Sequence, residues 1–192
     1  MNFLILHGTL GSPKDNWFPW LAGELEKLGH KTLRPQLPTP KGQTPQNWLK
    51  VISASVQKLG GANQKLIIIA HSRSPLAVCQ YLQSLDSPSN SPIAECFFVA
   101  GFATRFPIVD PYPELNYPFD DLGADWQMVR TNCKKFVCFA GDNDPYVPMS
   151  AMADFASQLR AKLFIIPKGG HFNTTSGFTK FPRLLKEIKA GI

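Results

Sequence analysis

The chain has 192 residues, of which 44% are hydrophobic and 11% aromatic, so it has ample material for a core and lacks the composition of a disordered protein. No run approaches the roughly 18 apolar residues of a membrane span, and the apolar start, Asn2 to His7, lacks the basic residues and cleavage site of a signal peptide. The net charge of +6 comes from Lys and Arg residues that are dispersed along the chain, which does not favour nucleic-acid binding.

Strand-like and helix-like segments alternate along the whole chain. Apolar, β-branched runs predict strands at Phe3–His7, Lys31–Arg34, Lys65–Ala70, Glu95–Ala100, Lys135–Ala140 and Leu163–Pro167. Helical patterns predict helices at Trp17–Leu28, Pro45–Leu59, Pro75–Leu85, Ser150–Leu159 and Lys180–Ala190. Such alternation is typical of βαβ units. We therefore expect one α/β domain over residues 1–192, a three-layer α/β/α sandwich with a mostly parallel, six-stranded sheet.

Capping signals support several of these helix boundaries. Asn16 is placed to cap the first helix, and Gly29 is placed to end it. Thr44-Pro45 combines an N-cap residue with proline at the first helical position, and Gly60-Gly61 ends the helix that follows. Ser150 is placed to cap the helix that begins there.

The most informative stretch is Ile-Ile-Ile-Ala-His-Ser-Arg-Ser, in which a predicted buried strand stops abruptly at Ser72. The next helix is predicted to begin at Pro75. A serine on such a tight strand-to-helix turn is typical of a nucleophile, and the alternative is an ordinary loop serine. The usual pattern is G-x-S-x-G, with small residues two before and two after the serine because strand and helix cross closely there. This chain has the small residues Ala70 and Ser74 at these positions.

Residues 102–132 interrupt the alternation. The segment is too rich in proline for a continuous helix and too aromatic for a disordered loop. It contains Pro107, Pro111, Pro113, Pro118, Phe106, Tyr112, Tyr117, Phe119 and Trp126. We predict a cover over the sheet edge near Ser72, with a short helix near Asp125–Arg130. The alternative is a surface loop whose aromatic side chains pack on the scaffold.

An acid and a base candidate follow two later strands. Asp142 and Asp144 both lie in the loop after Lys135–Ala140, and Asp144, which precedes Pro-Tyr-Val-Pro, is the favoured acid. His171 follows the last strand in Gly-Gly-His-Phe. Since the carboxyl ends of parallel strands lie along one edge of a sheet, Ser72, Asp144 and His171 can meet there.

Three other histidines compete with His171 for the role of base. His30 belongs to a helix-to-strand turn, His71 should point away from its neighbour Ser72, and His7 is better placed to shape the loop after the first strand. His171 is therefore the favoured base.

This set of residues suits acyl transfer. A serine hydroxyl needs a base to take its proton, and the base needs a carboxylate to fix its tautomer. The oxyanion intermediate needs preorganised donors, commonly two backbone N–H groups. The candidates are the N–H of Arg73, directly after the serine, and the N–H of Thr9, in a loop that Gly8 and Gly11 allow to bend. We expect no nucleotide cofactor, because that loop lacks both G-x-G-x-x-G and the Walker lysine pattern. We expect no metal, because the sequence offers no plausible cluster of metal ligands.

The chain resembles the retinoblastoma-binding-protein-nine and YdeN type of small serine hydrolase, within the α/β-hydrolase superfamily. The resemblance rests on motifs that span nearly the whole chain. They are His7-Gly8-Thr9, Ser12-Pro13 through Asn16-Trp17-Phe18-Pro19-Trp20-Leu21, the Ala-His-Ser elbow, Gly141-x-x-Asp144-Pro145-Tyr146-Val147-Pro148 and Gly169-Gly170-His171-Phe172. It implies a reduced α/β-hydrolase core without the early antiparallel strands, and a triad of Ser72, Asp144 and His171.

We therefore expect a serine hydrolase that acts on a small ester, or less favourably on an amide or peptide, through an acyl-enzyme. Trp17 and Trp126 are expected to wall its acyl pocket and to favour short to medium acyl groups. The alternative from another class is a non-catalytic protein-binding module with the same fold. Neither nucleic acid nor a membrane is an expected partner, and no particular protein partner is indicated.

The cysteines bear on the compartment. Cys79, Cys96, Cys133 and Cys138 form no C-x-x-C pair, which predicts buried, reduced thiols in a cytoplasmic protein. A basic stripe on the predicted last helix is interpreted as its solvated face.

Overall fold

The computed structural model describes residues 1–85, 92–108 and 111–192. The strands in these ranges form one sheet in the order β2-β1-β3-β4-β5-β6, and each neighbouring pair is parallel. They are β1 (Asn2–Leu6), β2 (Lys31–Leu33), β3 (Leu66–His71), β4 (Glu95–Val99), β5 (Phe136–Gly141) and β6 (Lys162–Ile166). The predicted six-stranded α/β architecture is confirmed.

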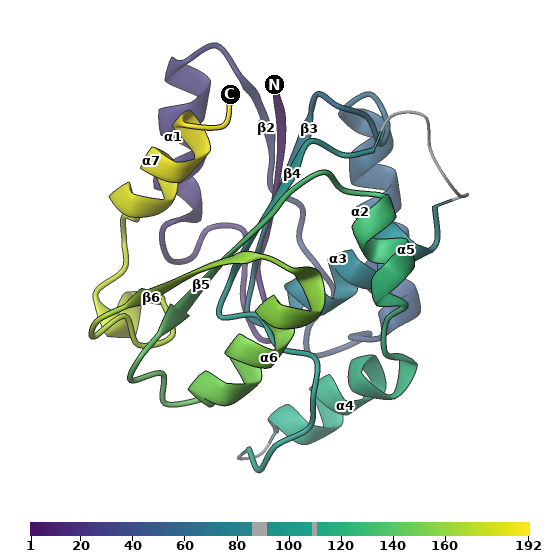
Figure 1. Cartoon of the computed structure of the whole chain (residues 1–192), viewed down its shortest axis with the longest axis vertical. Coiled ribbons are helices and arrows are strands. Elements are labelled where there is room, and N and C mark those ends of the chain that lie inside the picture. The colour runs from purple at the N-terminus through teal and green to yellow at the C-terminus, as the bar shows by residue number, and fades with distance from the viewer. Residues whose placement is uncertain (86–91, 109–110) are drawn as a thin grey trace.

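Helices cover both faces of the sheet, as Figure 1 shows. One face carries α1 (Phe18–Lys27) and α7 (Pro182–Lys189). The other carries α2 (Pro45–Lys58), α3 (Ser74–Gln83), α5 (Trp126–Thr131) and α6 (Met149–Leu159). This distribution follows from right-handed crossovers between parallel strands. The predicted boundaries of these elements agree with the structure to within a few residues.

The central strand β3 shows why the sheet is covered on both sides. Its side chains alternate, so that Leu66, Ile68 and Ala70 enter the core beneath α2 and α3. Ile67 and Ile69 enter the core beneath α1 and α7. Each Leu or Ile side chain that is fully buried in this way contributes about 1.5–3 kcal/mol to folding. A polar residue on either face of β3 would therefore be costly, which explains the uninterrupted apolar run.

The capping predictions hold for α2 and for the end of α1, where Gly29 follows the C-cap with a φ of 81°, and they fail for the starts of α1 and α6. Thr44 Oγ1 accepts a hydrogen bond from Asn47 N–H at 3.2 Å, and Pro45 opens α2 as predicted. Asn16 does not cap α1, because its Oδ1 accepts instead from the N–H of Thr174 at 2.9 Å. Ser150 lies inside α6, whose N-cap is a proline. In both wrong cases the helix begins one or two residues away from the position that the sequence suggested.

The cover segment contains a helix that the sequence did not predict, α4 (Tyr112–Leu122), which carries Pro118 in its interior. Tertiary contacts outweigh the proline: Phe119 is fully buried against the Trp48 ring, with ring centroids 4.9 Å apart. Gln80 Nε2 also donates to the carbonyl oxygens of Phe119 and Gly123 at 2.8 and 3.1 Å, near the end of the helix. The predicted short helix near Asp125–Arg130 is α5. Positions 109 and 110 of the predicted cover lie outside the described residues.

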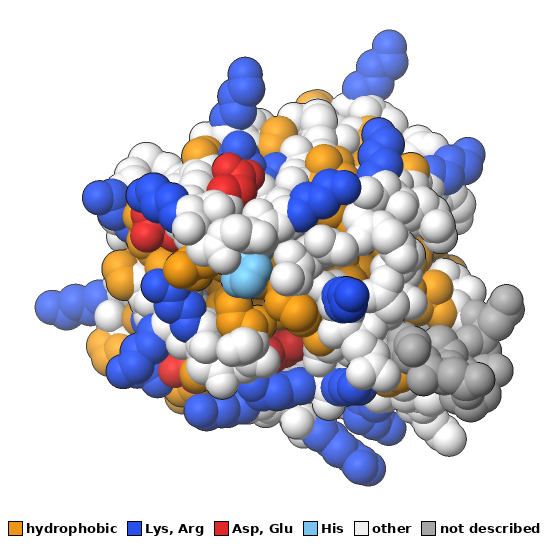
Figure 2. Space-filling model, turned by 90° about the horizontal axis from the view of Figure 1, so that it is seen from above, with side chains coloured by type: hydrophobic (Ala, Val, Ile, Leu, Met, Phe, Trp, Pro, Cys, Tyr) orange, Lys and Arg blue, Asp and Glu red, His pale blue; other side chains and the backbone are white. Residues whose placement is uncertain are grey.

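Basic side chains are dispersed over the face at which both termini lie, where Figure 2 shows Lys and Arg side chains among neutral ones. On α7, Arg183 pairs with Glu187 at 3.0 Å, and Lys186 and Lys189 are exposed to solvent. Within the ranges that the structure describes, none of the helices is both long and apolar enough to cross a bilayer.

Candidate active site

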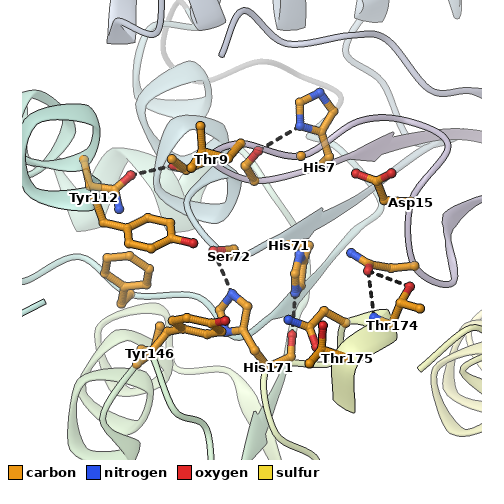
Figure 3. A pocket seen from close by; sticks show the side chains of 18 of the residues that line it. His7, Thr9, Asp15, His71, Ser72, Tyr112, Tyr146, His171, Thr174 and Thr175 are labelled. Carbon is orange, nitrogen blue, oxygen red and sulfur yellow. Dashed lines mark hydrogen bonds between the residues drawn. The ribbon is translucent and has the colours of Figure 1, made fainter. Parts of the chain in front are cut away.

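A cavity of about 220 Å³ opens at the carboxyl edge of the sheet, and Ser72 lies on its wall (Figure 3). One side of the cavity is largely apolar and consists of Phe102, Ile108, Tyr112, Tyr146 and Val147. The opposite side is polar and consists of Asp15, Asn16, Asn173, Thr174 and Thr175. A ligand in contact with Ser72 would therefore extend toward an aromatic wall on one side and hydrogen-bonding groups on the other.

Ser72 occupies a strained turn between β3 and α3. Its φ of 63° lies in the left-handed region, which a residue with a side chain adopts at a cost of about 1–3 kcal/mol. The Ser72 N–H donates to Val99 O on β4 at 2.9 Å, which ties the turn to the sheet. Gly8 packs directly against it, because a Cβ at position 8 would lie 2.6 Å from Ser72 Cβ. The strain is thus maintained by both neighbouring strands and presents the hydroxyl at the cavity.

Ser74, which stands where glycine is usual, braces the turn from inside. Its side chain is fully buried, and its Oγ accepts from the His71 N–H at 3.0 Å. The same hydroxyl lies 2.9 Å from His71 O and 3.2 Å from Leu6 O, two acceptors that it can serve as donor. Position 74 therefore accommodates a small polar side chain, because its hydroxyl bonds to backbone groups of His71 and Leu6.

The structure brings the side chains of Ser72, His171 and Asp144 into one hydrogen-bonded series. Ser72 Oγ lies 3.0 Å from His171 Nε2, and His171 Nδ1 lies 2.7 Å from Asp144 Oδ2. The other carboxylate oxygen of Asp144 accepts from the N–H groups of Tyr146 and Val147 at 2.8 and 3.0 Å. Since the Asp144 side chain is fully buried, both of its carboxylate oxygens accept hydrogen bonds from the protein rather than from bulk water.

Asp142, the other candidate acid, has a different position. Its carboxylate accepts from the N–H of Lys168 at 2.7 Å and is exposed to solvent. It therefore joins the loops after β5 and β6, and the structure does not bring it to the histidine.

Other polar side chains that sequence reasoning missed hold the His171 loop. Asn143 Oδ1 accepts from Gly170 N–H at 2.8 Å, and Ser176 Oγ accepts from His171 N–H at 3.2 Å. Gly141 lets the two loops meet, because any Cβ there would collide with the Gly170 carbonyl. The signal was available in Gly-Asp-Asn-Asp, where an amide between two acids suggests a role in loop pairing.

Two of the three remaining histidines lie at the site and have structural partners. His71 Nε2 donates to His171 O at 2.8 Å, and burial lowers the pKa of His71 to about 3, so its ring is neutral. His7 Nδ1 donates to Gly8 O at 2.8 Å, and its Nε2 accepts from Leu37 N–H at 2.9 Å. Burial also lowers the pKa of His7. Both rings therefore fix loops at the edge of the cavity.

The two candidate oxyanion donors lie beside Ser72. Thr9 lines the cavity next to Gly8, and Arg73 follows Ser72 directly in the chain. Among the described residues, neither the Thr9 N–H nor the Arg73 N–H has a hydrogen-bond partner. Both donors are therefore free to bind an oxygen of a ligand.

Trp17 and Trp126, expected to wall the pocket, do not line it. Trp17 is fully buried beneath the site, where its Nε1 donates to Phe172 O at 2.9 Å and its ring packs edge-on against Phe18. Trp126 packs edge-on against Phe155 on α6 and borders a separate surface hollow. Both rings are drawn into apolar contacts with the scaffold, and the expectation for them is wrong.

The wall is built instead by Tyr112 and Tyr146, whose ring centroids are 5.9 Å apart. Tyr146 also packs edge-on against His171 at 5.1 Å, so it supports the imidazole as well as the cavity. The position of Tyr146 could have been predicted, because it comes two residues after Asp144.

No group of three or more His, Cys, Asp or Glu side chains that could hold a metal ion occurs within residues 1–85, 92–108 and 111–192.

The family profile, the related sequences and the solved structure that match this chain agree with one another. The profile of the family described as "Serine hydrolase" matches residues 3–190. The protein described as "Putative hydrolase YdeN" from Bacillus subtilis (strain 168) is 29% identical over 178 residues, covering 93% of this chain and 89% of YdeN. The serine hydrolase RBBP9 of Rattus norvegicus is 22% identical over 175 residues, covering 91% and 85%. The crystal structure of the B. subtilis ydeN gene product superposes with a TM-score of 0.88 at 26% identity, covering 98% of this chain and 97% of the other.

Proposed function

Because this chain belongs to the serine hydrolase family, we propose that it hydrolyses small carboxylic esters through an acyl-enzyme formed on Ser72. His171 is the general base and acid, and Asp144 orients it. The observation that carries the proposal is the series of distances from Ser72 Oγ to His171 Nε2, 3.0 Å, and from His171 Nδ1 to Asp144 Oδ2, 2.7 Å. The first is a hydrogen-bond distance at which the serine proton can move to the imidazole, and the second lets the carboxylate hold the imidazole in the required tautomer.

The reaction proceeds in two halves. Ser72 Oγ attacks the ester carbonyl while His171 Nε2 takes its proton, which gives a tetrahedral oxyanion and an imidazolium beside Asp144. The intermediate collapses, the alcohol leaves with the proton from His171, and the acyl group remains on Ser72. A water molecule that loses its proton to His171 then attacks the acyl ester. The second intermediate releases the carboxylic acid and returns the proton to Ser72.

The free N–H groups of Thr9 and Arg73 are the proposed oxyanion donors. Charge develops on the carbonyl oxygen only in the transition state, so donors that are already oriented stabilise it without reorganisation. The contact between Gly8 and Ser72 supports this assignment, because it brings the loop that carries Thr9 next to the nucleophile.

The shape of the cavity supports a small substrate. A volume of about 220 Å³ is small beside the several hundred Å³ of pockets that bind larger ligands. The apolar side with Tyr112 and Tyr146 suits a short or medium acyl group, or an aromatic one. The polar side with Asp15 and Thr174 suits a hydroxylated or otherwise polar group. Amides and peptides of the same size are the second class of substrate, since the same steps cleave them.

The cysteines support a cytoplasmic location. All four are buried and free, and burial raises the pKa of Cys79, Cys96 and Cys138, which keeps these thiols protonated and unreactive. Free thiols of this kind persist in reducing compartments.

The proposal is tested with a fluorophosphonate probe and a panel of p-nitrophenyl esters, applied to the wild type, to Ser72→Ala and to Ser150→Ala. Ser150 is an exposed serine on α6 and serves as the matched control. We expect labelling and turnover in the wild type and in Ser150→Ala, and neither in Ser72→Ala. Matched p-nitroanilides rank esters against amides. A wild-type protein that takes no label and cleaves no substrate would instead be the non-catalytic binding module.

A further inference from the structure

Helix α4 contacts both residues whose N–H groups are the proposed oxyanion donors. Asn116 Oδ1 accepts a hydrogen bond from Thr9 Oγ1 at 2.6 Å. Asp120 Oδ1 accepts from Arg73 Nη1 at 2.7 Å. Asn116 and Asp120 are four residues apart, so they lie on the same side of the helix, one turn from each other. One helix thus bonds to the side chains of Thr9 and Arg73, the two residues whose N–H groups would bind the carbonyl oxygen of a substrate attacked by Ser72.

The contact with Arg73 is an almost fully buried ion pair. The Arg73 side chain is 1% exposed and that of Asp120 4%, and the guanidinium also lies 3.8 Å from the centre of the Phe102 ring. Burial lowers the pKa of Arg73, and the neighbouring carboxylate of Asp120 opposes that shift. Burying such a pair rarely increases stability over apolar residues of the same volume. Its presence directly behind the nucleophile therefore points to a role other than stability.

The contact with Thr9 belongs to a second buried polar group. The Thr9 hydroxyl donates to Asn116 and accepts from Gln43 Nε2 at 2.8 Å. Gln43 Nε2 also lies 2.9 Å from the carbonyl oxygen of Leu115, so it bonds to the same helix. Asn116 and Gln43 are both buried, with 4% and 6% of their surface exposed. The side chain of Thr9 is therefore fixed in one rotamer, although the residue itself belongs to a loop.

We propose that α4 positions the oxyanion hole, with Asn116 and Asp120 as the positioning residues that hold the backbone of Thr9 and of Arg73. The inference rests on the proposed hydrolase function. Oxyanion donors are effective only within a few tenths of an ångström of the developing charge. A backbone N–H cannot be held by its own hydrogen bond and remain free for the substrate. The hydrogen bonds of Ser72 N–H and Ser74 Oγ hold the turn from the side of the sheet. The side chains of Thr9 and Arg73 add a second attachment, because each is bound to α4.

The consequence is a specific kinetic signature. Substituting a positioning side chain leaves the N–H group in the chain but displaces it from the oxyanion. Acylation should slow, and a transition-state analogue should bind more weakly, whereas the KM for the ground-state ester should change little. If α4 only covers the cavity, the same substitutions should change the free energy of unfolding or KM. Any loss of affinity for the analogue would then equal the loss of affinity for the substrate.

The test compares Asn116→Ala and Asp120→Asn with Asp121→Asn, the matched control. Asp121 is the next residue on the same helix, and it pairs at the surface with Arg105. Kinetic constants for a short p-nitrophenyl ester and the inhibition constant of a short-chain alkyl boronic acid, which forms a tetrahedral adduct with serine, are measured for each. We expect kcat to fall, and the boronate inhibition constant to rise, about tenfold or more in the first two variants. Asp121→Asn should match the wild type.

A second pair of variants carries the test if Asp120→Asn folds poorly, because that change leaves a buried guanidinium without its counter-charge. Thr9→Val keeps the shape of the side chain and removes the hydroxyl, whereas Thr9→Ser keeps the hydroxyl. Thr9→Val should reproduce the loss in kcat and in boronate affinity, and Thr9→Ser should restore most of both.

The outcomes are distinguishable. If hydrolysis depends on Ser72 but Asn116→Ala and Thr9→Val keep the wild-type kcat and boronate affinity, α4 is only a cover and the inference is wrong. If the wild type shows no Ser72-dependent labelling or turnover, the proposed function itself fails, and the positioning role fails with it.

Discussion

Both carboxylate oxygens of Asp144 are occupied in the structure, one by His171 and the other by two backbone N–H groups. The backbone bonds fix the direction in which the carboxylate points. The Tyr146 ring, from the same loop, packs edge-on against His171. The orientation of the proposed base is therefore set by Asp144 together with the Tyr146 ring, whereas Asp142, two positions before Asp144, bonds to Lys168 N–H.

Asp144→Asn should lower kcat strongly, by about a hundredfold or more, with little change in KM. The amide can present its NH₂ group to His171 Nδ1, which leaves the imidazole in the tautomer that cannot accept the serine proton. Asp142→Asn is the control in the same loop and should alter kcat less than about threefold. Within the described part of the chain, its carboxylate accepts a side-chain hydrogen bond from Lys168 N–H and none from His171. Steady-state kinetics with one short ester decides the matter. A larger loss in Asp142→Asn would move the acid role to that residue.

At the scale of the element, α4 and α5 divide the cover segment into two parts with different neighbours. Tyr112, the first residue of α4, lines the cavity together with Tyr146. Trp126, the first residue of α5, packs against Phe155 on α6. The aromatic side chains of one continuous segment thus belong partly to the candidate site and partly to the scaffold, and each alternative that the sequence left open applies to one part.

Tyr112→Ala should shift the ester preference toward longer acyl chains, because it removes one ring of the apolar wall and enlarges the cavity on that side. Trp126→Ala is the matched aromatic control. It should leave the chain-length profile unchanged and lower the free energy of unfolding by about 0.5–3 kcal/mol. The measurements are kcat/KM for p-nitrophenyl esters of increasing acyl length, and urea unfolding of both variants. A shift of the profile in Trp126→Ala alone would reverse these assignments.

The whole molecule should lose stability as the pH falls below about 6.5. The pKa of His71 is lowered to about 3 by burial in the fold, whereas its ordinary value is 6.5. Between these pH values the unfolded chain binds a proton that the folded chain does not. The free energy of unfolding therefore falls with decreasing pH, by up to about 1.4 kcal/mol per pH unit from this residue. The pKa values of His7 and His30 are also lowered, which adds to the loss with the same sign.

His71→Gln should weaken this pH dependence, because glutamine keeps a donor for the His171 carbonyl but does not titrate. Urea unfolding of the wild type and the variant between pH 7 and pH 4 tests this. His30→Gln is the control at a more exposed histidine and should change the slope less. Parallel stability profiles for wild type and His71→Gln would show that His71 is not the group responsible.

Much of this molecule could be predicted from local sequence. The β-branched run of β3, the prolines and glycines around α2, and the positions of Ser72 and His171 after their strands depend on a few adjacent residues each. Short-range rules therefore located them, and the family match agrees with the resemblance that their motifs suggested. The roles of these residues as nucleophile and base stay predictions.

Only the tertiary structure decided the rest. Helix α4 forms despite Pro118 because Phe119 is buried against Trp48 and Gln80 bonds to carbonyl groups near its end. Trp17 and Trp126 turn toward the scaffold because partners far away in the chain, Phe172 and Phe155, lie there. The bonds from α4 to Thr9 and Arg73 likewise join segments that are remote in sequence. Local propensity determines where strands and helices occur, whereas the direction of a side chain depends on the packing of distant segments, which no local pattern contains.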